Sequence, residues 1–207
     1  RLPAATMVLA FAMIATAKEF RKEWRPRLQR LGVNYWASVH ALADGASWIW
    51  KAVGRVLTGC VETLDFYHAC AHLHKCAERI HGEDSAETKA AFKHGRSLLA
   101  RDGWAGVCQW VSELLGVEDE KERERRRPAT ERLIGYFAKH TKRLNYAERL
   151  KAGRAIGSGQ VEGKAKTLGL RLKRRGARWN KCNVAPMSSV ICVRHSSQWA
   201  PYWAMAA

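Results

Sequence analysis

The sequence has few acidic residues for its length, and this shortage sets the sign of its charge. Its 207 residues include 19 Asp and Glu against 36 Lys and Arg, which gives a formal net charge of +17. An excess of this size argues against a cationic partner. It favours a polyanion such as nucleic acid, or an anionic membrane surface.

A long apolar run and a closely spaced CxxC cysteine pair are also missing. Without the run, no segment is a convincing membrane span, and without the pair the common zinc-ribbon signal is absent. The six cysteines do not resemble the disulfide framework of a small secreted domain. We therefore expect reduced thiols in a cytoplasmic protein. An apolar fraction of 47% and nine Trp exclude wholesale disorder.

The N-terminal segment allows two interpretations. Met7–Ala17 (MVLAFAMIATA) is a short apolar run that ends in small residues, as a signal peptide does. It also fits a buried strand that leads into a helix over Ala17–Leu31, where apolar residues recur at helical spacing. The first residue is Arg1 rather than Met, which suggests a fragment of a longer chain. An exported basic protein with a cleaved leader is therefore one functional alternative.

Two strand-then-helix units follow. Val39–Ala43 is a short apolar strand closed by an Asp-Gly turn, and a helix is predicted from about Ala46 to Leu57. Cys60–Phe66 is the second strand candidate, and helical spacing returns from His68 to Ile80. Two such units in succession predict an α/β core.

The remainder divides into two parts. Residues 83–150 show no period-two segment and read as a helical insert, with helices over Glu87–Ala100, Gly103–Leu115 and Glu131–Tyr146. The last third opens with the glycine-rich Ala155–Gly159 and continues as helices. The predicted parts are therefore 1–82, 83–150 and 151–207, of which the first and third would form the core.

Two isolated carboxylates are candidate metal ligands. Glu162 is the one acid among eleven Lys and Arg over Arg149–Lys181, so it is either a salt-bridge partner or a ligand that holds Mg²⁺ against a phosphate. Asp44 is either an ordinary Asp-Gly turn residue or an acid at the carboxyl end of a strand, where α/β sheets place their ligands.

A histidine-rich helix offers another possible site. His68, His72 and Cys76 recur at i, i+4 and i+8 in the segment that follows Asp65, so they share one helix face. Zinc could use that face. A packed or hydrogen-bonded histidine cluster is the commoner outcome, and the usual paired-cysteine spacing is absent.

The basic segment around Glu162 has more cations than solubility needs. Phosphate contacts by Lys and Arg, with an aromatic ring able to stack on a base, explain it better than a solvated surface does. The predicted DNA-binding residues are Lys164, Lys166, Arg171, Lys173, Arg174, Arg175, Arg178 and Trp179.

Several blocks of this sequence resemble bacterial insertion-sequence transposases of the Kra type, in the Mutator-like branch of the DDE transposases. They are LADGASWIW (Leu42–Trp50), LDFYHACAHL (Leu64–Leu73), IGSGQVEGKAK (Ile156–Lys166) and RLKRRGARW (Arg171–Trp179). Their order and approximate spacing also match. The resemblance extends from about Phe11 to Trp203 and is loosest in the helical insert.

The resemblance implies an RNase H-like fold interrupted by an all-helical insert. It implies that Asp44 and Glu162 are the second and third acids of the catalytic triad, and that Asp65 and His68 form the acid-x-x-His element of this branch. It further implies two Mg²⁺ ions, for which Mn²⁺ could substitute, acting on a scissile DNA phosphate. DNA and further copies of the chain are the expected partners, and no membrane is expected.

One departure from the family pattern affects activity. No Asp or Glu precedes Glu19, so the first acid of the triad is missing from this chain. We therefore expect a transposase fragment that binds DNA but cleaves it poorly or not at all. The alternative is a basic nucleic-acid-binding protein without catalysis, either a decayed transposase or an unrelated protein.

Overall fold

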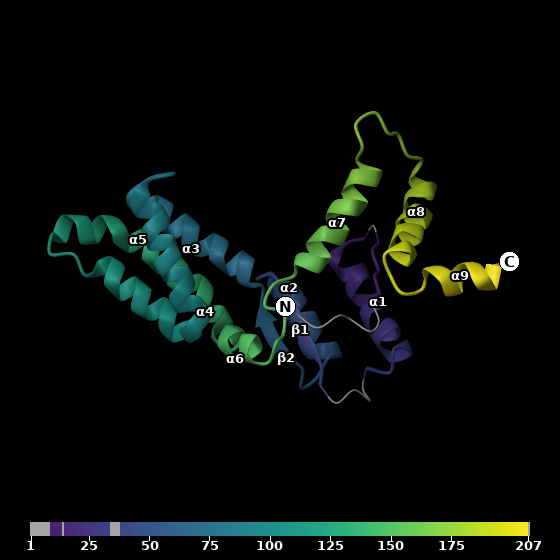
Figure 1. Ribbon diagram of the computed structural model, residues 1–207, viewed down its shortest axis with the longest axis horizontal. Helices are drawn as coiled ribbons and strands as arrows, with labels where there is room; N and C mark the ends of the chain where they lie inside the picture. The colour runs from purple at the N-terminus through teal and green to yellow at the C-terminus, as the bar shows by residue number, and fades with distance from the viewer. Residues whose placement is uncertain (1–8, 14, 34–37, 207) are drawn as a thin grey trace. The chain divides into compact units, whose positions relative to one another are not determined.

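The computed structural model describes residues 9–13, 15–33 and 38–206 (Figure 1). The chain divides into two compact units. Unit 1 combines residues 1–36 with residues 158–207, and unit 2 is the continuous stretch 37–157. We describe each unit by itself.

Unit 2 begins with the two predicted strand-then-helix units. Strand β1 (His40–Ala43) and strand β2 (Val61–Leu64) pair in parallel. Helix α2 (Ser47–Val56) follows β1, and helix α3 (Phe66–His81) follows β2. The strands and helices predicted between residues 39 and 80 are therefore confirmed, with small shifts at their ends.

Helix α4 (Ala86–Leu115) is a hairpin of two helical arms rather than one rod. The chain reverses at Gly103, whose φ of 55° lies in the region that suits glycine. The two arms pack against each other, and the Trp110 indole N–H of one arm donates to the Ala91 carbonyl of the other at 3.1 Å. The two helices predicted over 87–100 and 103–115 are these arms.

Helix α5 (Glu120–Phe137) begins with a highly charged run that faces solvent. Its carboxylates pair with arginines three and four residues further along, as Glu122 does with Arg125 and Arg126. The short helices η2 (Ala138–Arg143) and α6 (Tyr146–Lys151) complete unit 2.

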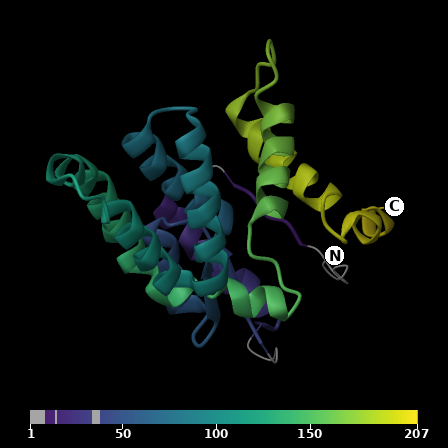
Figure 2. The ribbon, with the colours of Figure 1, turned by 60° about the vertical axis from the view of Figure 1, so that its left-hand side comes forward.

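The core of unit 2 lies between helices, not on the sheet. Helices α3, α4 and α5 lie side by side in both views (Figures 1 and 2). Their fully buried side chains include Leu73, Leu99, Trp110 and Phe137, and one apolar cluster joins them to Leu64 of β2. Removing this apolar surface from water is the main stabilising term of the unit.

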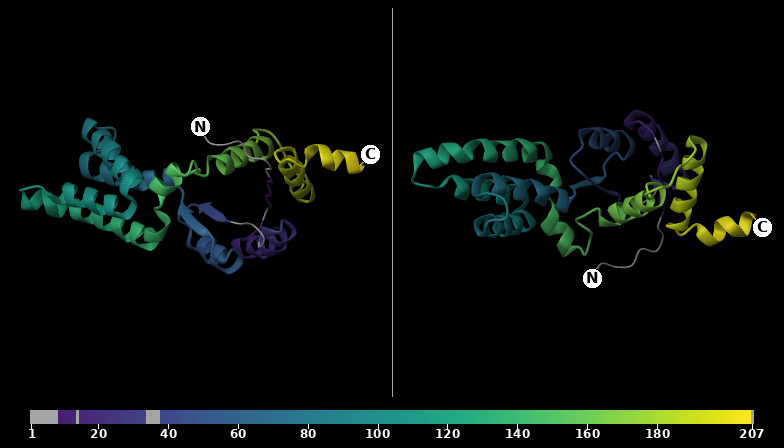
Figure 3. Two further views of the ribbon diagram at one scale, coloured as in Figure 1. Left: turned by 60° about the horizontal axis from the view of Figure 1, so that its bottom comes forward. Right: turned by 90° about the horizontal axis from the view of Figure 1, so that it is seen from above.

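Unit 1 holds four helices within its described residues. They are α1 (Ala17–Arg30), α7 (Gly159–Leu172), α8 (Lys181–Arg194) and α9 (Trp199–Ala206). Thr16 caps α1 in a capping box with Glu19, and α7 contacts α8 (Figure 3). The described residues bury few side chains here, and α1 and α7 bury none completely.

The expected RNase H-like α/β core, with an all-helical insert, is wrong. Helices take up 71% of the described residues, and the sheet among them has only two strands. The strand expected within Met7–Ala17 is not formed by residues 9–13, 15 or 16, and residues 7, 8 and 14 lie outside the described part. The physical reason is that a two-stranded sheet cannot bury enough apolar surface to organise a domain, so helices α3 to α5 do so instead.

None of the helices in the described ranges is both long and apolar enough to cross a membrane.

The α4 hairpin gives a direct test of this packing. A Cβ on Gly106 would overlap the Leu98 carbonyl of the opposite arm, whereas a Cβ on Gly135 of α5 would meet no atom within 4 Å. We expect Gly106→Ala to lower the free energy of unfolding by about 1–3 kcal/mol. The matched control Gly135→Ala should raise it by about 0.5–1 kcal/mol, because alanine favours the helix. Urea denaturation measures both, and effects of the same sign would contradict the hairpin.

Candidate functional site

The candidate site lies at the carboxyl edge of the two-stranded sheet. In the parallel register Ala43 is opposite Leu64, and the Asp65 amide donates to the Ala43 carbonyl at 2.7 Å. Asp44 and Asp65 are therefore the first residues beyond two neighbouring strands. The strand ends bring together two acids that are 21 positions apart in the sequence.

Asp44 is exposed and shapes its own turn. Its Oδ1 accepts a hydrogen bond from the Ala46 amide at 2.9 Å, which is an Asx turn that leads into α2. Within the described part of the chain its other oxygen has no partner. This carboxylate therefore stabilises the turn with one oxygen and presents the other oxygen to solvent.

Asp65 is buried, with 1% of its surface exposed, and caps helix α3. Its Oδ1 accepts from the His68 backbone amide at 2.7 Å, which is the usual bond between an N-cap side chain and the third helical residue. The acid-x-x-His spacing is therefore explained by helix capping.

Tyr136, from the end of α5, meets this edge. A Cβ on Gly45 would collide with the Tyr136 hydroxyl, so the ring packs directly against the turn that carries Asp44. The hydroxyl is buried and has no hydrogen-bond partner among the described residues. Burial, together with the nearby charges of Asp44 and Asp65, raises the pKa of Tyr136 to about 12, so the phenol stays protonated at neutral pH.

Two imidazoles contact Tyr136, and a third contacts one of these two. The His72 ring stacks on it at 3.6 Å between centroids, and the His140 ring lies 5.1 Å away. His68 contacts His72 edge to face at 5.4 Å. Burial is the main cause that lowers the pKa of His72 and of His140, and neighbouring positive charges add to it.

A glycine of the third resemblance block also reaches the site. A Cβ on Gly157 would come within 2.5 Å of the Tyr67 ring and 3.7 Å of the Asp65 Oδ2. The Phe66 amide donates to the carbonyl of Ile156, the residue before Gly157, at 2.9 Å, and this bond holds the segment in place. The glycine-rich joint therefore leaves unit 2 beside Asp65.

Glu162 belongs to unit 1, whereas Asp44 and Asp65 belong to unit 2. Glu162 is exposed in the first turn of α7 and accepts a hydrogen bond from the Ser158 hydroxyl at 3.3 Å. Its expected place in a metal pocket with Asp44 stays a prediction.

The predicted DNA-binding cations are largely on the surface. Lys166, Arg171, Lys173, Arg174, Arg175 and Arg178 are exposed on α7 and on the connection to α8. Lys164 differs, because its ammonium group donates to the His195 carbonyl. Trp179 is half-buried and its indole N–H is covered, so its proposed stacking on a base would use only part of the ring.

The zinc alternative finds no support. Among the residues the structure describes, no three His, Cys, Asp or Glu side chains are arranged to hold a metal ion. Cys76 is 2% exposed, and burial raises the pKa of its thiol to about 11. A buried thiol that stays protonated is a poor zinc ligand.

Tyr136 and His140 are the members of this site that the sequence did not indicate. Both lie on segments predicted only as helix, and their i, i+4 spacing is equally typical of core packing. The signal that would identify Tyr136 is its contact with Gly45 and His72, and His140 is identified by its contact with Tyr136; all of these contacts depend on tertiary structure.

Comparison of the chain with protein-family models, with curated proteins and with solved structures finds no match in any of the three.

The buried imidazole predicts a pH dependence of stability. In the unfolded chain, His72 binds a proton near pH 6.5. In the folded protein the pKa of His72 is lower, so the same proton binds only at a lower pH. The stability contributed by neutral His72 is complete above pH 6.5 and is lost as the pH falls towards the folded-state pKa, by up to about 1.4 kcal/mol per pH unit. His72→Phe keeps a ring over Tyr136 but cannot bind a proton.

We expect His72→Phe to resemble the unsubstituted protein in urea denaturation at pH 7.5. It should lose less stability than that protein does between pH 7.5 and pH 5. An equal loss in both would mean that His72 is not held neutral by the fold.

Proposed function

We propose that this chain is part of a transposase that binds DNA and contributes Asp44 to a Mg²⁺-dependent phosphodiester transfer. The observation that carries the proposal is the position of Asp44 and Asp65 directly after two paired parallel strands. Carboxylates at that edge are well placed for a ligand that bridges strand ends. The similarity of four sequence blocks to Kra-type transposases is the second support.

The donor chemistry of the edge suits Mg²⁺. This ion prefers oxygen ligands and is commonly held by one or two carboxylates together with substrate phosphates. Asp44 is exposed and would present an oxygen to it, while Asp65 is committed to capping α3. When bound, the ion would supply charge stabilisation at the phosphate and activate the attacking oxygen.

Side chains of the protein itself would bind and orient the DNA. The exposed cations of α7 and of the connection after it would neutralise backbone phosphates and orient the DNA strand. The neutral phenol of Tyr136 adds no further negative charge to the carboxylate edge.

We propose further that the chain by itself cleaves DNA poorly or not at all. The family pattern places its first acid ahead of the segment that contains Glu19, and residues 1–18 of this sequence include no Asp or Glu. Two carboxylates hold a divalent cation less tightly than three do, so both occupancy and rate should fall.

A DNA-binding protein without catalysis is the second candidate. It is favoured by Asp65, whose cap on α3 explains this acid without any chemistry. The two candidates differ in what Asp44 does. An enzyme fragment needs the carboxylate charge of Asp44 to bind the metal, whereas a binding protein needs only the hydrogen bond from the Ala46 amide that stabilises the turn.

The DNA-binding part of the proposal is tested with paired charge variants. We expect Arg174→Gln/Arg175→Gln to weaken binding of a short duplex and to reduce the slope of log K against log salt by about 2, if each arginine neutralises one phosphate. The control Lys89→Gln/Lys93→Gln removes two exposed charges from α4 and should change the slope less. Fluorescence anisotropy over a salt series measures both, and equal slopes for both variants would contradict the assignment.

The role of Asp44 is tested by the effect of Mg²⁺ on the same binding. We expect Mg²⁺ to strengthen DNA binding, and Asp44→Asn to remove this effect while keeping the acceptor for the Ala46 amide. An unchanged Mg²⁺ effect in Asp44→Asn would favour the binding protein without catalysis. Robust Mg²⁺-dependent nicking by this chain would refute the proposed inactivity.

A further inference from the structure

We propose that a cavity between α3 and α5 binds a phosphate group, and that this group belongs to the backbone of the DNA on which the proposed function acts. The cavity lies within unit 2 and has a volume of about 40 Å³. A single water needs about 10–15 Å³, so the cavity has room for more than one water or for part of an oxyanion.

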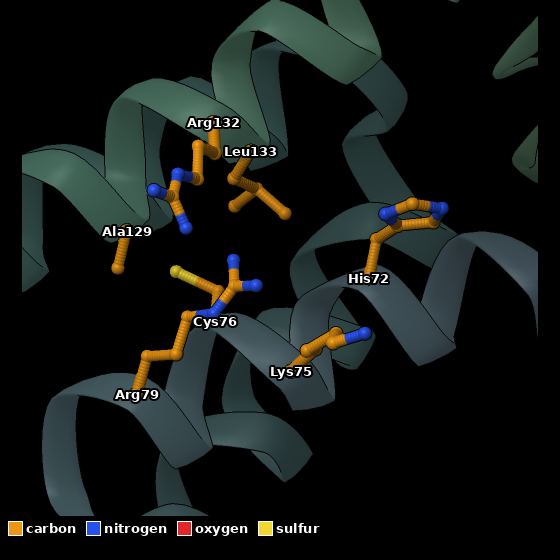
Figure 4. Close-up of a pocket in the computed structure, with 7 residues that line it drawn as sticks. All are labelled: His72, Lys75, Cys76, Arg79, Ala129, Arg132 and Leu133. Carbon is orange, nitrogen blue, oxygen red and sulfur yellow. The ribbon is translucent and has the colours of Figure 1, made fainter.

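Its lining is rich in positive charge and contains no carboxylate. Arg79 and Lys75 come from α3, and Arg132 comes from α5. In Figure 4 the two guanidinium groups point into the space between the helices, near the Cys76 side chain. Three cations with no acid among the lining residues form a site that attracts anions.

These cations have no acidic partners in the described residues. The neighbouring carboxylates are engaged elsewhere: Glu78 pairs with His74, and Glu122 pairs with arginines of its own helix. Like charges that face each other repel, and the repulsion is only partly screened by water. An anion between the guanidinium groups would turn this repulsion into two attractive contacts.

The floor of the cavity is neutral. Leu133 and Ala129 of α5 contribute apolar surface, and the Cys76 thiol is protonated because burial raises its pKa to about 11. The protein therefore supplies no negative charge of its own at this place. His72 also lines the cavity and could add a hydrogen bond to a bound oxygen.

Guanidinium geometry selects the class of ligand. Each arginine presents a planar fork of N–H donors that matches two oxygens of a phosphate or carboxylate, and two arginines together suit a tetrahedral oxyanion. Arg79 and Arg132 are both exposed at the protein surface, so a phosphate within a polymer can reach them.

Helix α3 connects this cavity to the carboxylate edge, which favours DNA as the source of the phosphate. Asp65 caps the start of α3 and Cys76 lies eleven residues further, so the two are separated by roughly 16 Å along the helix axis. Phosphates of one DNA strand advance by about 3.4 Å per base pair, so a duplex lying along α3 would cover this length with about five base pairs. His72 takes part at both places, because it stacks on Tyr136 and lines the cavity.

The phosphate site is tested first with inorganic phosphate alone. We expect the melting temperature of the whole chain to rise saturably with phosphate at constant ionic strength, by about 2–4 °C once phosphate reaches about five times its Kd. Arg79→Gln/Arg132→Gln should lose this rise, whereas the control Lys89→Gln/Lys93→Gln should keep it. A rise of the same size in both variants, or no rise in the unsubstituted protein, would overturn the site.

The source of the phosphate is tested with DNA. We expect Arg79→Gln/Arg132→Gln to weaken duplex binding by about tenfold and to lower the salt slope by about 1, as for one lost phosphate. Loss of the phosphate-induced rise with unchanged DNA binding would overturn DNA as the source and leave a site for free phosphate.

This test separates the cavity from the proposed function. If the unsubstituted chain fails to bind DNA, the proposed function fails, and the response to inorganic phosphate still decides whether the cavity holds an anion. If the chain binds DNA and Arg79→Gln/Arg132→Gln behaves like the control, the cavity proposal alone fails.

Discussion

The parallel pairing of β1 with β2 is the contact on which the site depends. It is only four residues long, yet it sets Ala43 opposite Leu64 and so brings Asp44 and Asp65 to one edge. A slip of one residue would exchange the faces of every side chain on one strand and separate the two acids. The hydrogen bond from the Asp65 amide to the Ala43 carbonyl extends this register to the capping residue of α3. A small sheet can therefore define a site even where helices supply the stability.

Helices α3 to α5 have two roles in this arrangement. Their shared core fixes α3, and the end of α5 delivers Tyr136 to the carboxylate edge. Further along α3, the same helix pair leaves three cations around a neutral floor. The carboxylates at one end of α3 would suit a divalent cation, and the positive charges further along the helix would suit a phosphate polymer.

Local structure could be predicted from the sequence, whereas the fold class could not. The strand over 39–43, the helix break at Gly103 and the charged solvent face of α5 follow from periodicity and turn chemistry, which act over a few residues. The RNase H-like core is wrong because two correctly predicted strands do not imply that others join them. In the site, Asp44 was predicted by its position after a strand, whereas Asp65 was indicated only by the family resemblance, because the predicted strand ran past it to Phe66. Tyr136 was not predicted, because its packing against Gly45 joins residues about ninety positions apart.

The most direct test of the carboxylate edge is to follow backbone amide resonances during titration with Mn²⁺, which broadens signals from nuclei close to the bound ion. We predict that the amides of Gly45 and Ala46 broaden together with those of Phe66 and His68, at Mn²⁺ well below one equivalent. Asp44→Asn should abolish this selectivity. Broadening of only one of the two strand ends, or uniform broadening over the chain, would contradict a divalent-cation site at the edge of the sheet.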